Sequence, residues 1–177
     1  VGDGLKKVLQ EGKALYKAGD IAGATAKLKE ANISEVVGKG ANGGVGTVAV
    51  DAGSVKGVNP TGSTQNCTNC VAVVDNLLTT GNPASALPRA TPVPFDQLGQ
   101  MYGTKLSGWT SQQTIESTLL AQGNGARAVI YGTDGATGHV WNAVVQNGKV
   151  NYIDGQIGGS GASNFKAFTN FQFGILS

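Results

Sequence analysis

Two cysteines and one histidine are the side chains of this 177-residue sequence best suited to covalent chemistry. Cys67 and Cys70 lie three residues apart, and His139 is the only histidine. A thiol attacks as its thiolate, and an imidazole oriented by a carboxylate is a common way to produce one. Asp154, at the end of the strand expected after His139, supplies such a carboxylate. These residues indicate an enzyme with a cysteine nucleophile.

A predicted β-hairpin determines where His139 lies relative to Asp154. Asn147-Gly148 is a strong signal for a two-residue turn, and it joins expected strands at 139–146 and 149–154. With this turn, residue 146 pairs with 149, 144 with 151, 141 with 154 and 139 with 156. Because side chains alternate between the faces of a sheet, His139 and Asp154 become diagonal neighbours on one face, within hydrogen-bonding reach. A slip of one residue would place them on opposite faces.

The two cysteines have different settings. Polar residues precede Cys67, and an apolar stripe with helical spacing follows, so we expect a helix over 67–78 with Cys67 at its start. Free backbone amides and the helix dipole there favour a thiolate, whereas Cys70 joins the apolar stripe. We therefore favour Cys67 as the nucleophile. Cys70 is the alternative, because a helix beginning three residues later would reverse the choice.

Three further side chains are candidates for contacts with an oxyanion or with substrate. Gln65 lies just before the predicted helix, and Gln156 pairs with His139 in the predicted hairpin. Trp141 shares the face of His139. Backbone amides at the helix start would complete a site for an oxyanion.

The cysteine pair is also compatible with three roles that involve no nucleophilic attack on a substrate carbonyl. Such a pair can pack in a core, act as a redox couple, or supply two zinc ligands completed by His139 and Asp154. The redox couple is typical of a parallel α/β fold, which the sequence does not indicate. A structural zinc site more often uses further cysteine or histidine. With structural or zinc-binding cysteines the chain would be a non-enzymatic binding module, but we expect no metal and no cofactor.

The helices that must position these residues lie before the predicted hairpin. Four prolines between 83 and 94 favour an extended path, and a short helix is expected over 95–102. Thr110 with Gln113 forms a predicted capping box for a helix that runs to Ala121. We expect its Ile115, Leu119 and Leu120 to face the core and Gly123 to end it.

The strands complete an expected α+β fold. A strand over 127–133 precedes the hairpin, and 165–173 is expected to form another strand or a closing segment. Helices come before the sheet and do not alternate with it, which is typical of α+β proteins. The nucleophile helix should therefore pack on an antiparallel sheet.

The first third of the chain has a different character. Residues 1–37 are predicted to form a helical linker or docking segment, and 38–64 a glycine-rich connector. The remaining residues, 65–177, are expected to form the catalytic domain. The chain begins without Met or a secretory signal pattern, which favours a fragment cut from a longer precursor.

Composition excludes several classes of function. The net charge is +2, and the basic residues near the N-terminus are mixed with acidic ones, which indicates a solvated helix face and not nucleic-acid binding. No apolar run approaches the roughly 18 to 20 residues of a membrane-spanning helix. We therefore expect neither a nucleic-acid partner nor a membrane span.

The sequence resembles the papain-fold toxin domains of bacterial polymorphic toxins, often described as glutamine deamidases. The resemblance covers about 65–158 and rests on motifs in order: Asn66-Cys67-x-x-Cys70, Asp75-x-Leu77-Leu78, Gly81-Asn82-Pro83-Ala84-Ser85-Ala86-Leu87-Pro88, Gly138-His139-Val140-Trp141-Asn142, Asn147-Gly148-Lys149-Val150 and Tyr152-Ile153-Asp154-Gly155-Gln156.

The resemblance implies a papain-like fold and a triad of Cys67, His139 and Asp154. Aligning Cys67 to Val71 with the papain-type Cys-Gly-Ser-Cys-Trp would instead put the nucleophile at Cys70. The resemblance further implies a secreted effector that is delivered into the cytoplasm of a target cell, with a cognate immunity protein in the producer. The activity would be deamidation of a protein glutamine through a thioester; proteolysis and transglutamination use the same chemistry.

Overall fold

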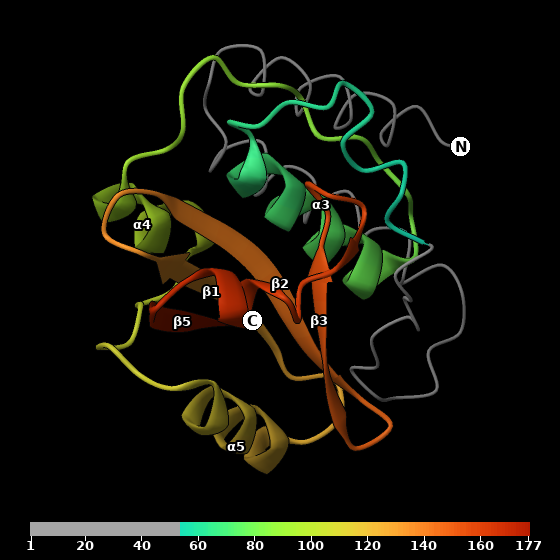
Figure 1. Ribbon diagram of the computed structural model, residues 1–177. Coiled ribbons are helices and arrows are strands. Elements are labelled where there is room, and N and C mark those ends of the chain that lie inside the picture. Colours follow the sequence, from blue (N-terminus) through green and yellow to red (C-terminus); the bar gives the residue numbers. More distant parts are fainter. Residues whose placement is uncertain (1–53) are drawn as a thin grey trace. The chain divides into compact units, whose positions relative to one another are not determined.

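The computed structural model describes residues 54–177, and they contain one five-stranded sheet with helices on both faces (Figure 1). The helical elements are α3 (Cys67–Thr80), η1 (Phe95–Gln97), α4 (Leu98–Tyr102), α5 (Gln112–Gln122) and α6 (Asn164–Ala167). The strands are β1 (Arg127–Thr133), β2 (Gly138–Gln146), β3 (Lys149–Asp154), β4 (Gly159–Ser160) and β5 (Asn170–Leu176). They pair antiparallel in the order β4-β3-β2-β1-β5. The predicted α+β class is confirmed.

Helix α3 packs against one face of the sheet, as its apolar stripe predicts. Its buried Val74 and Leu78 share a core cluster with Val144 of β2 and Ile153 of β3. The helix ends at Gly81, whose φ of 73° is a left-handed conformation that glycine adopts without a side-chain clash. The predicted helix over 67–78 is confirmed and continues to Thr80.

Helix α5 covers the opposite face. Ile115 and Leu119 are fully buried against side chains of β1, β2 and β3, as predicted. Two details of the prediction are wrong. The N-cap is Ser111, not Thr110, because the Ser111 hydroxyl accepts the backbone N–H of Thr114. Leu120 is exposed, because about 100° of helix rotation separates it from Leu119.

The β2–β3 hairpin has the predicted turn and register over most of its length. Asn147 and Gly148 have φ of 53° and 71°, the left-handed values of this turn type. Residue 146 pairs with 149 and residue 144 with 151, and the ladder reaches 142 and 153. The predicted pairings of 141 with 154 and of 139 with 156 are not part of this ladder, which stops one residue before Asp154, the last residue of β3.

The C-terminal segment closes the far edge of the sheet. The stretch 165–173 divides into α6 and the beginning of β5, and β5 pairs with β1 along its full length. The stretch therefore contains both a short helix and the start of an edge strand that closes the sheet. This edge also carries Thr110, which forms an isolated bridge with Phe171.

The segment before α3 packs on the helix. Val55 and Val58 are buried in the same cluster as Val74. The predicted helical segment 1–37 and most of the connector 38–64 lie outside the described residues, so the domain boundaries stay predictions. Among the helices of residues 54–177, none has the length and apolar content needed to cross a membrane.

Candidate active site

Cys67 is the first residue of α3 and is partly exposed, whereas Cys70 is buried one turn further along. Burial, followed by the negative charges of Cys67 and Asp154, raises the pKa of the Cys70 thiol to about 12. Such a thiol stays protonated at neutral pH. The two cysteines are both free, so no disulfide ties them together.

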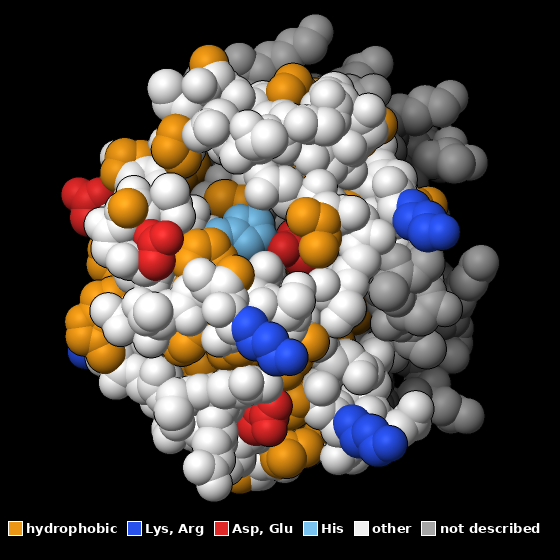
Figure 2. Space-filling view, viewed as in Figure 1, with side chains coloured by type: hydrophobic (Ala, Val, Ile, Leu, Met, Phe, Trp, Pro, Cys, Tyr) orange, Lys and Arg blue, Asp and Glu red, His pale blue; other side chains and the backbone are white. Residues whose placement is uncertain are grey.

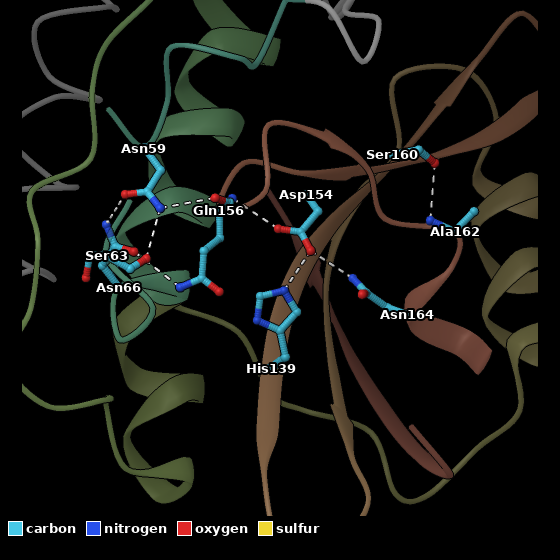
Figure 3. A network of polar contacts seen from close by, with 9 residues as sticks. All are labelled: Asn59, Ser63, Asn66, His139, Asp154, Gln156, Ser160, Ala162 and Asn164. Carbon is cyan, nitrogen blue, oxygen red and sulfur yellow. Dashed lines mark hydrogen bonds and ion pairs between the residues drawn. The ribbon is translucent and has the colours of Figure 1, made fainter. Parts of the chain in front are cut away.

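His139 and Asp154 form a short contact at the end of the β2–β3 ladder. The imidazole Nε2 lies 2.7 Å from Asp154 Oδ2. Asp154 is 1% exposed, and it accepts two further hydrogen bonds, from Asn164 Nδ2 to Oδ2 at 2.9 Å and from the backbone N–H of Gln156 to Oδ1 at 3.0 Å. Figure 3 shows the carboxylate between the imidazole and the Asn164 amide. The carboxylate is therefore fixed by donors on three sides.

The electrostatics of this pair favour its charged form. Burial disfavours the imidazolium, but hydrogen bonds to Asp154 and Cys67 and the negative charges of both outweigh it and raise the pKa of His139 to about 9. Burial would also raise the pKa of Asp154. Hydrogen bonds from His139, Asn164 and the Gln156 amide, with the charge of His139, hold the pKa of Asp154 below its usual range.

The thiol and the imidazole open into the same pocket. Cys67 and His139 both line a cavity of about 160 Å³ whose other walls include Phe95 and Tyr131. Since Nε2 is held by Asp154, Nδ1 is the ring nitrogen left to interact with Cys67. In Figure 2 the imidazole lies in a hollow, with an acidic side chain beside it and hydrophobic side chains around it. A substrate in this hollow would reach the thiol and the imidazole together.

A chain of side-chain amides joins the start of α3 to the turn that follows Asp154 (Figure 3). Gln156 Nε2 donates to Asn66 Oδ1 at 3.2 Å, and Asn66 Nδ2 donates to Asn59 Oδ1 at 3.0 Å. Asn59 Nδ2 also donates to the backbone oxygen of Gln156 at 3.1 Å. The residue before the nucleophile candidate is thus tied to the residues after the acid.

The same chain of amides leaves the helix start uncapped. Asn66 is the N-cap of α3, but its side chain makes no capping hydrogen bond, because its oxygen accepts from Gln156. The first backbone N–H groups of a helix have no partner within the helix. They are therefore available to a negatively charged group next to Cys67.

The three side chains predicted to contact oxyanion or substrate lie in different places. Gln65 is exposed, and its side chain bonds the neighbouring Thr64. The Gln156 amide is occupied by Asn66. Trp141 is fully buried behind the imidazole, with ring centroids 5.9 Å apart, so it supports His139 from the core and does not line the pocket.

Sequence reasoning missed Asn164 and the aromatic wall of the pocket. Asn164 lies ten residues after Asp154, in a segment without a regular pattern, so no spacing signal marks it. Phe95, the first residue of η1, and Tyr131 of β1 come together with their ring centroids 4.7 Å apart. Only the folded arrangement brings these residues to Cys67.

The geometry fits acyl-transfer chemistry better than metal binding. Across residues 54–177, no three side chains of His, Cys, Asp or Glu converge in a way that could hold a metal ion. The site instead contains a partly exposed thiol, an imidazole and a buried carboxylate. In such an arrangement the imidazole can activate the thiol as a base, and the carboxylate orients the imidazole.

Comparison with known families gives an independent result. Residues 65–159, more than half of the chain, match the model of the family described as papain fold toxin 1, glutamine deamidase. No curated protein and no solved structure gives a significant match. The family match confirms the resemblance inferred from the sequence and, with the α+β architecture, the predicted papain-like fold.

Proposed function

Because the chain belongs to the papain-fold toxin family of glutamine deamidases, we propose that Cys67, His139 and Asp154 form a catalytic triad that deamidates a glutamine of a target protein. The observation that carries this proposal is the 2.7 Å contact between His139 and Asp154 at an open pocket that Cys67 and His139 line together. The proposed nucleophile is Cys67 because Cys70 is buried with a thiol pKa of about 12.

In the first half-reaction, the thiolate of Cys67 attacks the side-chain carbonyl carbon of glutamine and the carbonyl oxygen becomes an oxyanion. When the tetrahedral intermediate collapses, the carbon–nitrogen bond breaks. The imidazolium of His139 gives its proton to the departing nitrogen, which leaves as ammonia. The product on the enzyme is a thioester, and His139 is then neutral.

In the second half-reaction, neutral His139 takes a proton from water as the water oxygen attacks the thioester carbon. The carbon–sulfur bond breaks, the thiolate returns and the target carries a glutamate. Throughout, Asp154 keeps the imidazole oriented and stabilises its charged form. The hydrogen bond at 2.7 Å is consistent with that role.

We assign the oxyanion to the uncapped backbone amides at the start of α3. Asn66 does not use its side chain as a cap, so these donors stay free beside Cys67. The side chain of Gln156 is already engaged with Asn66, so it is a less suitable oxyanion donor than the amides. Preorganised donors of this kind stabilise the charge that develops in the transition state.

The biological proposal follows from the toxin family. The domain would be the effector of a polymorphic toxin, secreted and delivered to a target cell, where it acts on a cytoplasmic protein while a cognate immunity protein guards the producer. Residues 65–177 would be the catalytic domain, 38–64 the connector and 1–37 a helical linker or docking segment.

The test is intact-mass and peptide mass analysis of proteins from cells that express the full chain. We expect a gain of about one dalton at specific glutamines, because an amide nitrogen is replaced by oxygen. Cys67→Ala should abolish the change, and the matched variant Cys70→Ala should retain it if folded. Cleaved fragments would instead show a protease, amine adducts would show a transglutaminase, and activity in Cys67→Ala would refute the nucleophile.

A further inference from the structure

The cavity at Cys67 and His139 is lined mainly by apolar side chains that take no part in the proposed reaction. Six apolar or aromatic side chains line it: Pro92, Val93, Phe95, Leu98, Tyr131 and Val140. No charged side chain other than the imidazole of His139 is among its lining residues. The carboxamide of a substrate must lie at Cys67 and His139, so the apolar remainder of the cavity is free for another part of the substrate.

The aromatic wall depends on a specific backbone position. A side-chain carbon at Gly138 would lie 2.8 Å from ring atoms of Tyr131, so the glycine allows the ring to lie over the start of β2, next to His139. Phe95 packs on Tyr131 at a centroid distance of 4.7 Å. The Phe95 side chain is nevertheless 43% exposed, which leaves apolar surface at the pocket for a partner to cover.

We propose that this cavity is a subsite for one large apolar side chain of the target protein, aromatic or branched aliphatic, next to the glutamine that is attacked. The inference rests on the proposed deamidase function and adds a sequence preference to it. A cavity of about 150 Å³ with apolar walls can hold a benzene molecule. The whole cavity at Cys67 and His139 is about 160 Å³ and is open to solvent on the Phe95 side, so beside the carboxamide it has room for one ring or one branched chain that extends over Phe95.

The subsite would select target sequences by the free energy of burying the side chain next to the glutamine. An apolar side chain gains by leaving water, and methylene-sized differences in such pockets change kcat/KM by about ten- to two-hundredfold. A charged side chain would lose its hydration without a partner among the apolar walls. The preferred order next to the target glutamine is therefore aromatic or leucine first, alanine next and aspartate or lysine last.

The experiment compares peptides that contain one glutamine and differ only in the residue before or after it, Phe or Ala. Ammonia release gives kcat/KM for the full chain. We expect the Phe peptide to exceed the Ala peptide about ten- to hundredfold. Phe95→Ala should lower kcat/KM for the Phe peptide much more than for the Ala peptide and so remove most of this preference. Trp109→Ala is the matched control, because Trp109 is an exposed aromatic residue that does not line the cavity.

A second measurement separates failure of the subsite from failure of the function. Protection of Cys67 from iodoacetamide by each peptide reports occupancy without turnover. Stronger protection by the Phe peptide, lost in Phe95→Ala, supports the subsite even if the peptide is cleaved and not deamidated. Equal kcat/KM and equal protection by both peptides would overturn the subsite and leave the deamidase proposal intact.

Discussion

Two aspartates of this protein make contacts of the same length with opposite consequences. Asp154 lies 2.7 Å from His139 at the pocket, and Asp75 of α3 lies 2.7 Å from Arg127 of β1. Both carboxylates are buried. An imidazole changes its charge near physiological pH, whereas a guanidinium stays charged. The first pair can therefore move a proton, and the second can only hold two elements together.

The two pairs also differ in whether they reach a cavity. His139 lines an open cavity together with Cys67, while the side chains of Arg127 and Asp75 are 7% and 11% exposed and do not line that cavity. A short buried ion pair is therefore weak evidence for catalysis on its own. Stronger evidence for catalysis is a carboxylate whose partner side chain can change its charge and also lies at a pocket beside a nucleophile.

The largest expected effect comes from Asp154→Asn. The amide keeps the shape of the carboxylate but removes the charge that orients and stabilises the imidazolium, so kcat for ammonia release should fall about a thousandfold to ten-thousandfold. Circular dichroism and thermal unfolding should show a folded domain. A loss of activity smaller than tenfold would mean that the carboxylate is structural, like Asp75.

Arg127→Met should have the opposite effect: it should lower stability and leave catalysis almost unchanged. It leaves the buried carboxylate of Asp75 without its partner, so the free energy of unfolding in urea should fall by about 3–5 kcal/mol. Ammonia release per folded molecule should change little, because neither residue lines the pocket beside Cys67. The double variant Asp75→Leu, Arg127→Met removes both charges and should regain much of the stability. A large loss of kcat in the folded single variant would contradict the comparison.

The two pairs should also differ in their response to pH. His139 gives the only imidazole signal of the chain, so its titration can be followed directly by NMR, and the midpoint is expected at about 9. Because the folded-state pKa is raised, its contribution to stability is fully present below about pH 6.5 and is lost as pH rises through about 9. Ammonia release should decline over the same upper range as the acid is lost.

Asp154→Asn sharpens this measurement. It removes the hydrogen bond and the charge that raise the pKa of His139, and it leaves the burial that lowers it, so the midpoint should move to lower pH. Arg127→Met should leave the midpoint in place. A midpoint that is unchanged in Asp154→Asn would show that Cys67, not Asp154, dominates the shift.

Local sequence signals predict the part of this site that lies on regular elements. The Asn147-Gly148 turn determines the face of His139 and Asp154, and the apolar stripe locates the start of α3 at Cys67. Period-2 and period-3.6 patterns report such positions directly. The predicted pairings of 141 with 154 and 139 with 156 fail because pattern reasoning extends the ladder beyond Ile153, near the end of β3.

The rest of the site depends on contacts between residues far apart in the sequence. The sequence marks Asn66 only as a polar residue before the helix, yet it is fully buried because Asn59 and Gln156 bond its amide. Tyr131 has the pattern of an ordinary strand residue, and its place in the pocket follows from Phe95 and Gly138. A single sequence carries no periodic signal for such tertiary contacts.

The smallest expected effect belongs to Asn164→Leu, which tests whether the third donor on Asp154 contributes to function. The Asn164 amide helps to keep the pKa of Asp154 low, so its loss should raise that pKa and move the acid limb of ammonia release to higher pH. We expect kcat to fall about tenfold, because one hydrogen bond that orients the carboxylate is lost while its charge remains. Asn151→Leu is the matched control, since its amide bonds the Gln146 side chain, away from Asp154. A merely structural Asn164 would change thermal stability but leave the acid limb where it is, and this outcome would place Asn164 with Arg127 and not with His139.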